Sequence, residues 1–389
     1  MNDGQKLTFQ FLRCGIFGGA LSENSKNAVN DENLKKIYQC LHMHDMAHLV
    51  AEVLSASGLK DDFKEAFQVL KRAQQLAVYR FEGMRYQFER ICETLETAGI
   101  PYMPLKGAVL RAYYPENWKR TSCDIDILVK PENLDGAKEA LKAKLGYTEE
   151  GLHAHEVSLY SEDGVHLELH YELISPDEST LHRKMLENVW DVCTVKSGTQ
   201  YRYEMPETYF YFYNLAHTAK HFTLTGGCGI RSILDLYLYT KKHTDVIEKS
   251  KPLLKEGKLE TFAAATETLG KIWFEDAEST PLMDKTTDYI LKGGTYGSAN
   301  NKVDALQRKE GGRFKYAMHR LFLPYSKLKI VYPVLNKQKW LYPFLTFWRW
   351  LKLLFGGTKK STKAEIRALS QGKKQDEEIA KLFDALEVS

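Results

Sequence analysis

Three acidic residues in the middle of the chain have the spacing that metal chemistry requires. In the stretch DIDILV, Asp124 and Asp126 alternate with isoleucines, so a β-strand would place both carboxylates on one face. Glu168 alternates with leucines in the same way in the stretch VHLELH. If the two strands are neighbours, their three carboxylates form an oxygen cage suited to Mg²⁺. A solvated, half-exposed sheet face is the alternative, and it is the commoner origin of an isolated DxD pattern.

A glycine turn precedes the aspartates and is suited to binding phosphate. The short β-like run IPYMPLKG ends at Gly107 and leads into the short helix AVLRAYY, seventeen positions before Asp124. Backbone amides at such a turn, together with the helix dipole, favour an anion. Lys106 either adds positive charge for a triphosphate or is a surface lysine beside the turn.

Further polar residues lie close to these motifs. Arg120 and Ser122 come just before the aspartates, where either side chain could contact phosphate. Arg120 could instead pair with Asp124 or Asp126 for structural reasons. His170 follows on the strand face of Glu168, where it either tunes the carboxylates, binds a metal or makes a structural hydrogen bond.

A helical region after residue 206 contributes four more polar candidates: His217, His221, Arg231 and Asp235. The two histidines are four residues apart and therefore share one helix face. A zinc site is not indicated, because the glutamate of the HExxH pattern and a third ligand are both missing. The four residues either line a cleft or belong to a packed pair of helices.

The elements around these candidates divide the chain into a mixed core with helical flanks. Residues 1–99 have apolar residues at helical spacing, ending in a proline-free stretch of nearly forty residues that predicts one long helix or two in series. Residues 100–205 alternate short apolar runs, two helices and two hairpin patterns, whereas 206–295 is helical again. A basic, aromatic-rich segment occupies 296–389. The pattern predicts an α+β fold in which helical N-terminal and C-terminal domains flank a mixed sheet.

Composition limits the class and location of the protein. A hydrophobic content of 43% and a charged content of 27% are typical of a soluble globular chain. The N-terminal residues lack the pattern of a signal peptide, and the six scattered cysteines suit free thiols. We therefore expect a cytoplasmic protein, with peripheral attachment to a membrane as the alternative.

Positive charge is concentrated near the C-terminus. Residues 313–374 contain fifteen Lys or Arg and a single acid, Glu365. This segment is predicted to contact an anionic surface: a membrane, an RNA or the acidic remainder of the same chain. We find no feature of the sequence that indicates the oligomeric state of the protein.

The order of these motifs resembles the DNA polymerase β-like nucleotidyltransferase superfamily, with its glycine turn, aspartate-pair strand and later acidic strand. The stretches LETAGIPYMPLKG, RTSCDIDILV, VHLELH and LAHTAKHF resemble more closely a bacterial family of largely uncharacterised nucleotidyltransferases. Many superfamily members have Gly-Ser at the phosphate turn, whereas this chain has Gly107 followed by alanine.

The resemblance implies roles for several residues. Asp124, Asp126 and Glu168 would ligate two Mg²⁺ ions, and Gly107 with its neighbours would contact the phosphates of an NTP. The implied reaction moves an NMP from the NTP to a hydroxyl-bearing acceptor and releases pyrophosphate. Two alternatives remain: an inactive nucleotide-binding regulator, and an interaction module that docks through its basic C-terminal segment on membrane or RNA.

Overall fold

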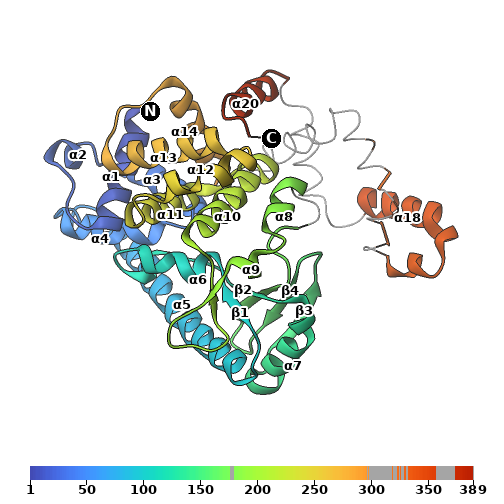
Figure 1. The fold of residues 1–389 in the computed structure, drawn as a ribbon. Helices are drawn as coiled ribbons and strands as arrows, with labels where there is room; N and C mark the ends of the chain where they lie inside the picture. The colour runs from blue at the N-terminus through green and yellow to red at the C-terminus, as the bar shows by residue number, and fades with distance from the viewer. Residues whose placement is uncertain are drawn as a thin grey trace.

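The computed structural model describes residues 1–175, 179–295, 332–355 and 373–388, with scattered positions between 297 and 329. A mixed five-stranded sheet forms the lower part of the molecule in Figure 1, and a lobe of helices lies above it. The predicted α+β class, with helices on both sides of the sheet in sequence, is confirmed.

The sheet has the strand order β1-β2-β5-β4-β3. Its strands are β1 (Tyr102–Pro104), β2 (Asp124–Val129), β3 (Thr148–Leu152), β4 (Glu156–Tyr160) and β5 (His166–His170). β2 and β5 are parallel, and the other neighbouring pairs are antiparallel. The parallel pair requires a crossover, which includes α7 (Leu134–Leu145) and the β3–β4 hairpin.

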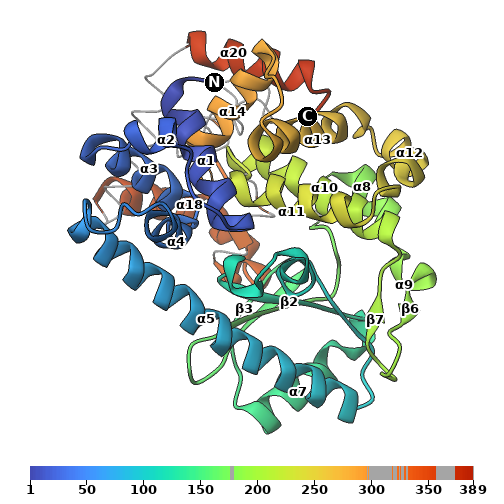
Figure 2. The same ribbon diagram turned by 90° about the vertical axis from the view of Figure 1, so that its left-hand side faces the viewer.

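One face of the sheet is apolar because of the period-two alternation in β2 and β5. Ile125, Ile127, Leu167 and Leu169 are buried on that face in one hydrophobic cluster. α5 (Lys64–Thr97) and α7 cover it, and Figure 2 shows α5 as a long oblique helix beside α7. Of the two interpretations of the proline-free stretch before residue 99, the structure confirms the single long helix. The opposite, polar face of the sheet is left for the helical lobe.

The helical lobe is built from both ends of the chain. Its later helices are α10 (Glu207–Lys220), α11 (Gly229–Lys242), α12 (Val246–Glu256), α13 (Glu260–Glu275) and α14 (Pro281–Gly293). Its earlier helices are α1 (Asp3–Phe17), α2 (Glu23–Asn27), α3 (Asp31–Met43) and α4 (Val50–Ala56). The two sets share one core, in which the rings of Phe9 and Trp273 stack with centroids 4.7 Å apart. The division into four domains at residues 99, 205 and 295 stays a prediction.

Smaller elements complete the described chain: α6 (Lys106–Leu110), α8 (Thr180–Leu186), α9 (Val189–Val192), β6 (Thr194–Val195), β7 (Tyr203–Glu204), α18 (Tyr342–Phe355) and α20 (Lys373–Ala385). Part of the basic segment 313–374 lies outside the described residues, so its contact with membrane or RNA stays a prediction. None of the helices in the described ranges combines the length and apolar character needed to cross a bilayer.

Candidate active site

The three carboxylates singled out by the sequence line one cleft. Asp126 pairs directly with Glu168 across the parallel strands β2 and β5, and Asp124 is two residues earlier on the same face. The cleft has a volume of about 350 Å³ and lies between this polar sheet face and helices α6, α10 and α11. The structure therefore brings Asp124, Asp126 and Glu168 together at the junction of the two layers.

Asp126 is the most buried of the three and has two cationic or donor partners. Its Oδ1 atom accepts a hydrogen bond from Lys106 Nζ at 2.8 Å and lies 3.0 Å from His170 Nε2. Only 3% of Asp126 is exposed. Burial by itself would raise the pKa of this carboxyl, but Lys106 and His170 outweigh it and hold the pKa well below its usual range. Asp126 is therefore ionised at neutral pH.

The electrostatics of Asp124 favour a cation in the cleft. Burial raises the pKa of Asp124, and the negative charges of Asp126 and Glu168 raise it further. Glu168 is half-buried; burial opposes its ionisation, but a hydrogen bond with His170 lowers its pKa. A divalent ion would remove the repulsion that Asp124 experiences.

The donor set fits a divalent cation. Ligand atoms of Asp126, Glu168 and His170 lie within 4.8 Å of one another, and so do those of Asp124, His166 and Glu168. Carboxylate oxygens are the ligands that Mg²⁺ prefers, and each of the two groups contains two of the three acids and shares Glu168. His170 is bound to two of the acids, so it also serves to orient them.

The turn that carries Lys106 and Gly107 has an unusual backbone. Lys106 has φ +36°, a left-handed value that side chains other than glycine, asparagine and aspartate rarely adopt. The Leu105 amide donates to the Asp126 carbonyl at 3.0 Å, which ties the turn to β2. A Cβ atom on Gly107 would lie 2.6 Å from Arg120 Nη1. The glycine is thus required by close packing, and the strained lysine points at a carboxylate of the cleft.

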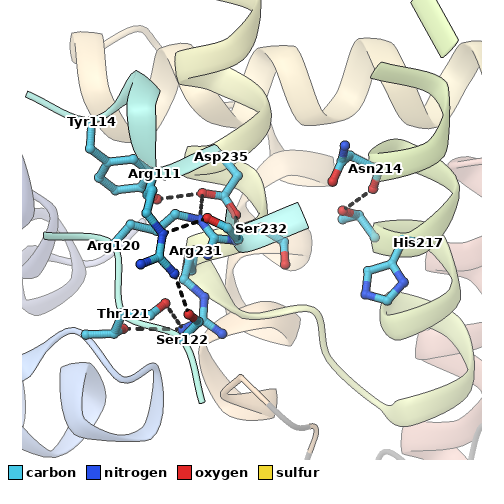
Figure 3. Close-up of polar contacts among 12 residues, drawn as sticks. Arg111, Tyr114, Arg120, Thr121, Ser122, Asn214, His217, Arg231, Ser232 and Asp235 are labelled. Atoms are coloured by element: carbon cyan, nitrogen blue, oxygen red, sulfur yellow. Dashed lines mark hydrogen bonds and ion pairs between the residues drawn. The ribbon is translucent and has the colours of Figure 1, made fainter. Parts of the chain in front are cut away.

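Arg120 is held by an ion pair, but with a different aspartate from those considered in the sequence. Its Nε and Nη2 atoms donate to the two oxygens of Asp235 at 2.9 and 2.7 Å. The hydroxyl of Tyr114 donates to the same carboxylate at 2.7 Å, as Figure 3 shows. Both charged side chains are buried. This bidentate pair joins the loop before β2 to α11 and forms one wall of the cleft.

Ser122 and Arg231 lie on the loop side of the same wall. Ser122 accepts a hydrogen bond from Arg111 Nη2 at 2.9 Å. Arg231 Nη1 donates to the carbonyl of Thr121 at 2.8 Å and lies 3.4 Å from Asp45 Oδ2. Figure 3 shows the contacts of Arg111 with Ser122 and of Arg231 with Thr121, which place positive charge at both sides of the loop that leads into β2.

α10 supplies the wall opposite the sheet. His217 and His221 both line the cleft, and their Nε2 atoms are 3.0 Å apart. Burial lowers the pKa of both imidazoles, and the positive charge of Lys106 adds to the effect. They are therefore neutral at physiological pH. A one-turn π-helix begins at His221 and extends to Thr225, directly after α10. Single π-helical turns within α-helices frequently occur at functional sites.

Some cleft residues were not identified in the sequence. Asn214, Thr218 and Lys220 precede or follow the two histidines on α10, and His155 and Glu156 come from the edge of β4. Glu156 pairs directly with His170 across β4 and β5. The alternation in EVSLY signals its strand face, whereas the pairing of β4 with β5 on that face had to come from the fold. Arg111 does not line the cleft but contacts Ser122, and it was also missed because it stands in an otherwise apolar short helix.

Comparison with known proteins assigns the chain to a family. The chain matches the model of a family described as "Uncharacterised nucleotidyltransferase" over residues 30–275, and it belongs to this family. The family resemblance in the sequence is thereby confirmed. No curated protein was found that matches the chain.

Among solved structures, the chain is similar to the solution structure of the antibiotic-resistance factor ANT(2'')-Ia. The match has 12% sequence identity and a TM-score of 0.33, and it covers 45% of this chain and 92% of that chain. A likeness of this size carries no information about substrate.

Proposed function

We propose that the protein is a Mg²⁺-dependent enzyme that transfers an NMP from an NTP to a hydroxyl-bearing acceptor and releases pyrophosphate. The observation that carries this proposal is the pairing of Asp126 with Glu168, with Asp124 beside them, in a cleft that has basic side chains on its walls. Family membership supports a transferase of this general kind.

Asp124, Asp126 and Glu168 would hold the metal, for which two ions are expected by analogy with two-metal phosphoryl transfer. Bound Mg²⁺ would neutralise the charge that develops on the phosphoryl oxygens. Glu168 is the more exposed partner of the Asp126–Glu168 pair, and its carboxylate would take the proton of an acceptor hydroxyl. His170 would orient both carboxylates, through its hydrogen bond with Asp126 and its approach to Glu168 Oε2 at 3.5 Å.

The positive side chains of the cleft would bind the triphosphate. Lys106 and Arg231 approach the cleft from the sheet side and from α11, and Gly107 lets the backbone of the turn come close to a phosphate. Ser122 can donate its hydroxyl to a phosphate oxygen. Arg120 would form part of the cleft wall rather than bind phosphate through Nε or Nη2, because both atoms already donate to Asp235.

The histidines of α10 are suited to contacts with uncharged groups. His217 and His221 are neutral, so each ring offers one donor and one acceptor rather than a positive charge. A nucleobase edge or a ribose hydroxyl matches this pair better than a phosphate does. They would therefore contact the base or the ribose of the nucleotide rather than its phosphates.

A direct test uses α-labelled NTPs with Mg²⁺, first alone and then with sugars, antibiotic-like molecules, protein and RNA as acceptors. Transfer of label and release of pyrophosphate should be abolished by Asp126→Asn. The matched control is Asp163→Asn, because Asp163 is an exposed carboxylate in the β4–β5 turn. Activity that survives in Asp126→Asn would contradict the proposal.

A nucleotide-binding regulator is the second candidate, and one contact favours it. Lys106 Nζ already neutralises Asp126, the central carboxylate of the metal site. If that ion pair persists when nucleotide binds, the cleft holds an NTP without turning it over. Calorimetry with each NTP separates the two functions: tight binding with no pyrophosphate release from any NTP or acceptor indicates the regulator.

A further inference from the structure

A second cavity lies on the other side of α10 from the carboxylate cleft. Asn214, His217, Thr218 and His221 face the cleft, whereas Ala216, Ala219, Lys220 and Thr223 line the second cavity. At 100° per residue these two sets lie on opposite sides of one helix. Lys220 borders both cavities.

Apolar side chains from four parts of the chain form the walls of this cavity. They are Ile174 after β5, Leu181 on α8, Leu259 between α12 and α13, and Phe383 and Val388 at the C-terminus. Ile174, Leu259, Phe383 and Val388 are buried. Figures 1 and 2 both show α8 beside α10, and residues of α8 and of α20 line the same cavity.

The C-terminal helix α20 is firmly attached at this place. The ring of Phe383 lies 5.3 Å from that of Phe222 and 5.6 Å, edge to face, from that of Tyr289. Thr261 donates a hydrogen bond to Glu387, which joins the end of the chain to α13. The cavity is therefore bounded by packed elements on the α20 side as well as on the α10 side.

The size and the rim of the cavity indicate the kind of ligand. Its volume is about 510 Å³, which is larger than the carboxylate cleft and within the range of sites for small organic molecules. The rim carries two lysines and two acids, Lys220, Lys258, Asp384 and Glu387, so the formal charges balance. Apolar walls with a balanced rim fit an uncharged molecule with an apolar body and a polar end.

We propose that this cavity is a second ligand site, which binds a small, uncharged, mainly apolar organic molecule between α8, α10 and α20. The apolar body lies against Leu259 and Phe383, and its polar end lies at the charged rim. The site is independent of the metal-binding carboxylates, because none of its lining residues is one of them.

The test uses N-phenyl-1-naphthylamine, an uncharged aromatic amine whose fluorescence rises in apolar surroundings. The full-length protein should bind one equivalent saturably. Ala380→Trp fills the cavity from the face of α20 that lines it and should weaken binding at least tenfold. Ala385→Trp is the matched control, because Ala385 is exposed on the same helix and does not line the cavity.

A second variant distinguishes loss of the binding site from misfolding of the protein. Leu181→Glu puts a charge into the apolar wall from the half-buried start of α8, and it should also weaken binding at least tenfold while the melting curve is retained. Asp126→Asn should bind the probe as the wild type does, so loss of transferase activity has no bearing on this site. The proposal is overturned if the wild type shows no saturable binding, or if folded Ala380→Trp and Leu181→Glu bind as tightly as Ala385→Trp.

Discussion

Asp126 and Glu168 are direct partners across the parallel strands β2 and β5, and His170 Nε2 lies 3.0 Å from the first carboxylate and 3.5 Å from the second. Two acids brought together in this way repel each other unless positive charge is close. In the protein alone that charge comes from Lys106, whose Nζ is 2.8 Å from Asp126. In the enzyme proposed above, the lysine and a metal ion would compete for the same carboxylate.

This competition makes Lys106→Met informative. Removing the lysine leaves His170 as the remaining positive partner of Asp126, so the metal site becomes more negative by one charge. We expect Mn²⁺, measured by the electron paramagnetic resonance of the free ion, to bind about tenfold more tightly, equivalent to roughly 1.4 kcal/mol. Lys138→Met, which removes a half-buried helix lysine paired with Asp135 and Glu149 away from the cleft, should leave Mn²⁺ affinity unchanged. Weaker Mn²⁺ binding in Lys106→Met would show that the lysine supports the metal instead of competing with it.

Two glycines should respond in opposite ways to the same substitution. In Gly107→Ala the new methyl group meets Arg120 Nη1 at 2.6 Å, and Asp235 prevents that guanidinium from moving freely. We expect a loss of about 1–3 kcal/mol in the free energy of unfolding, measured with urea. Gly83→Ala, in open space within α5, should add about 0.5–1 kcal/mol because alanine favours the helix. Equal effects at the two positions would refute the packing argument.

The buried pair of Arg120 and Asp235 should contribute far more to stability than a surface pair. Asp235→Ala leaves the Arg120 guanidinium buried without a counter-charge and also removes the acceptor of Tyr114. The expected loss is about 3–5 kcal/mol in the free energy of unfolding. Glu82→Ala removes an exposed partner of Arg85 and should cost at most about 1 kcal/mol. Similar losses for the two variants would mean that Arg120 finds another partner.

Stability should fall in acid because of His44. Its Nδ1 atom accepts from the Ile230 amide at 3.2 Å, so the ring is neutral, and burial lowers its pKa to about 4. The unfolded chain, with the ordinary histidine pKa near 6.5, binds this proton more readily. His44 therefore contributes full stability above pH 6.5 and loses it progressively as the pH falls toward 4, by roughly 2 kcal/mol at pH 5.

The urea-unfolding free energy measured between pH 7 and 5 checks this expectation. His44→Gln has no titrating group at this position, so its free energy should change less over the same interval than that of the wild type. An identical pH slope in the two proteins would mean that other groups cause the acid sensitivity.

Several features of the fold could be predicted because they depend on local pattern. The alternation of acids with isoleucines in DIDILV specified a strand and its polar face, and helical spacing without proline specified α5. The prediction that Asp124, Asp126 and Glu168 lie together needed one further assumption, that β2 and β5 are neighbours. The structure confirms this assumption, because the two strands pair in parallel.

By itself, the sequence determined which residue types could perform the chemistry and on which face of their strand or helix they lie. Tertiary structure alone decided the partners: Asp235 for Arg120, Asp126 for Lys106, and Glu156 for His170. These pairs join residues that are 14 to 115 positions apart in the chain, as the numbering shows. Local periodicity carries no information at such separations, because the contacts depend on how the sheet and the helical lobe pack together.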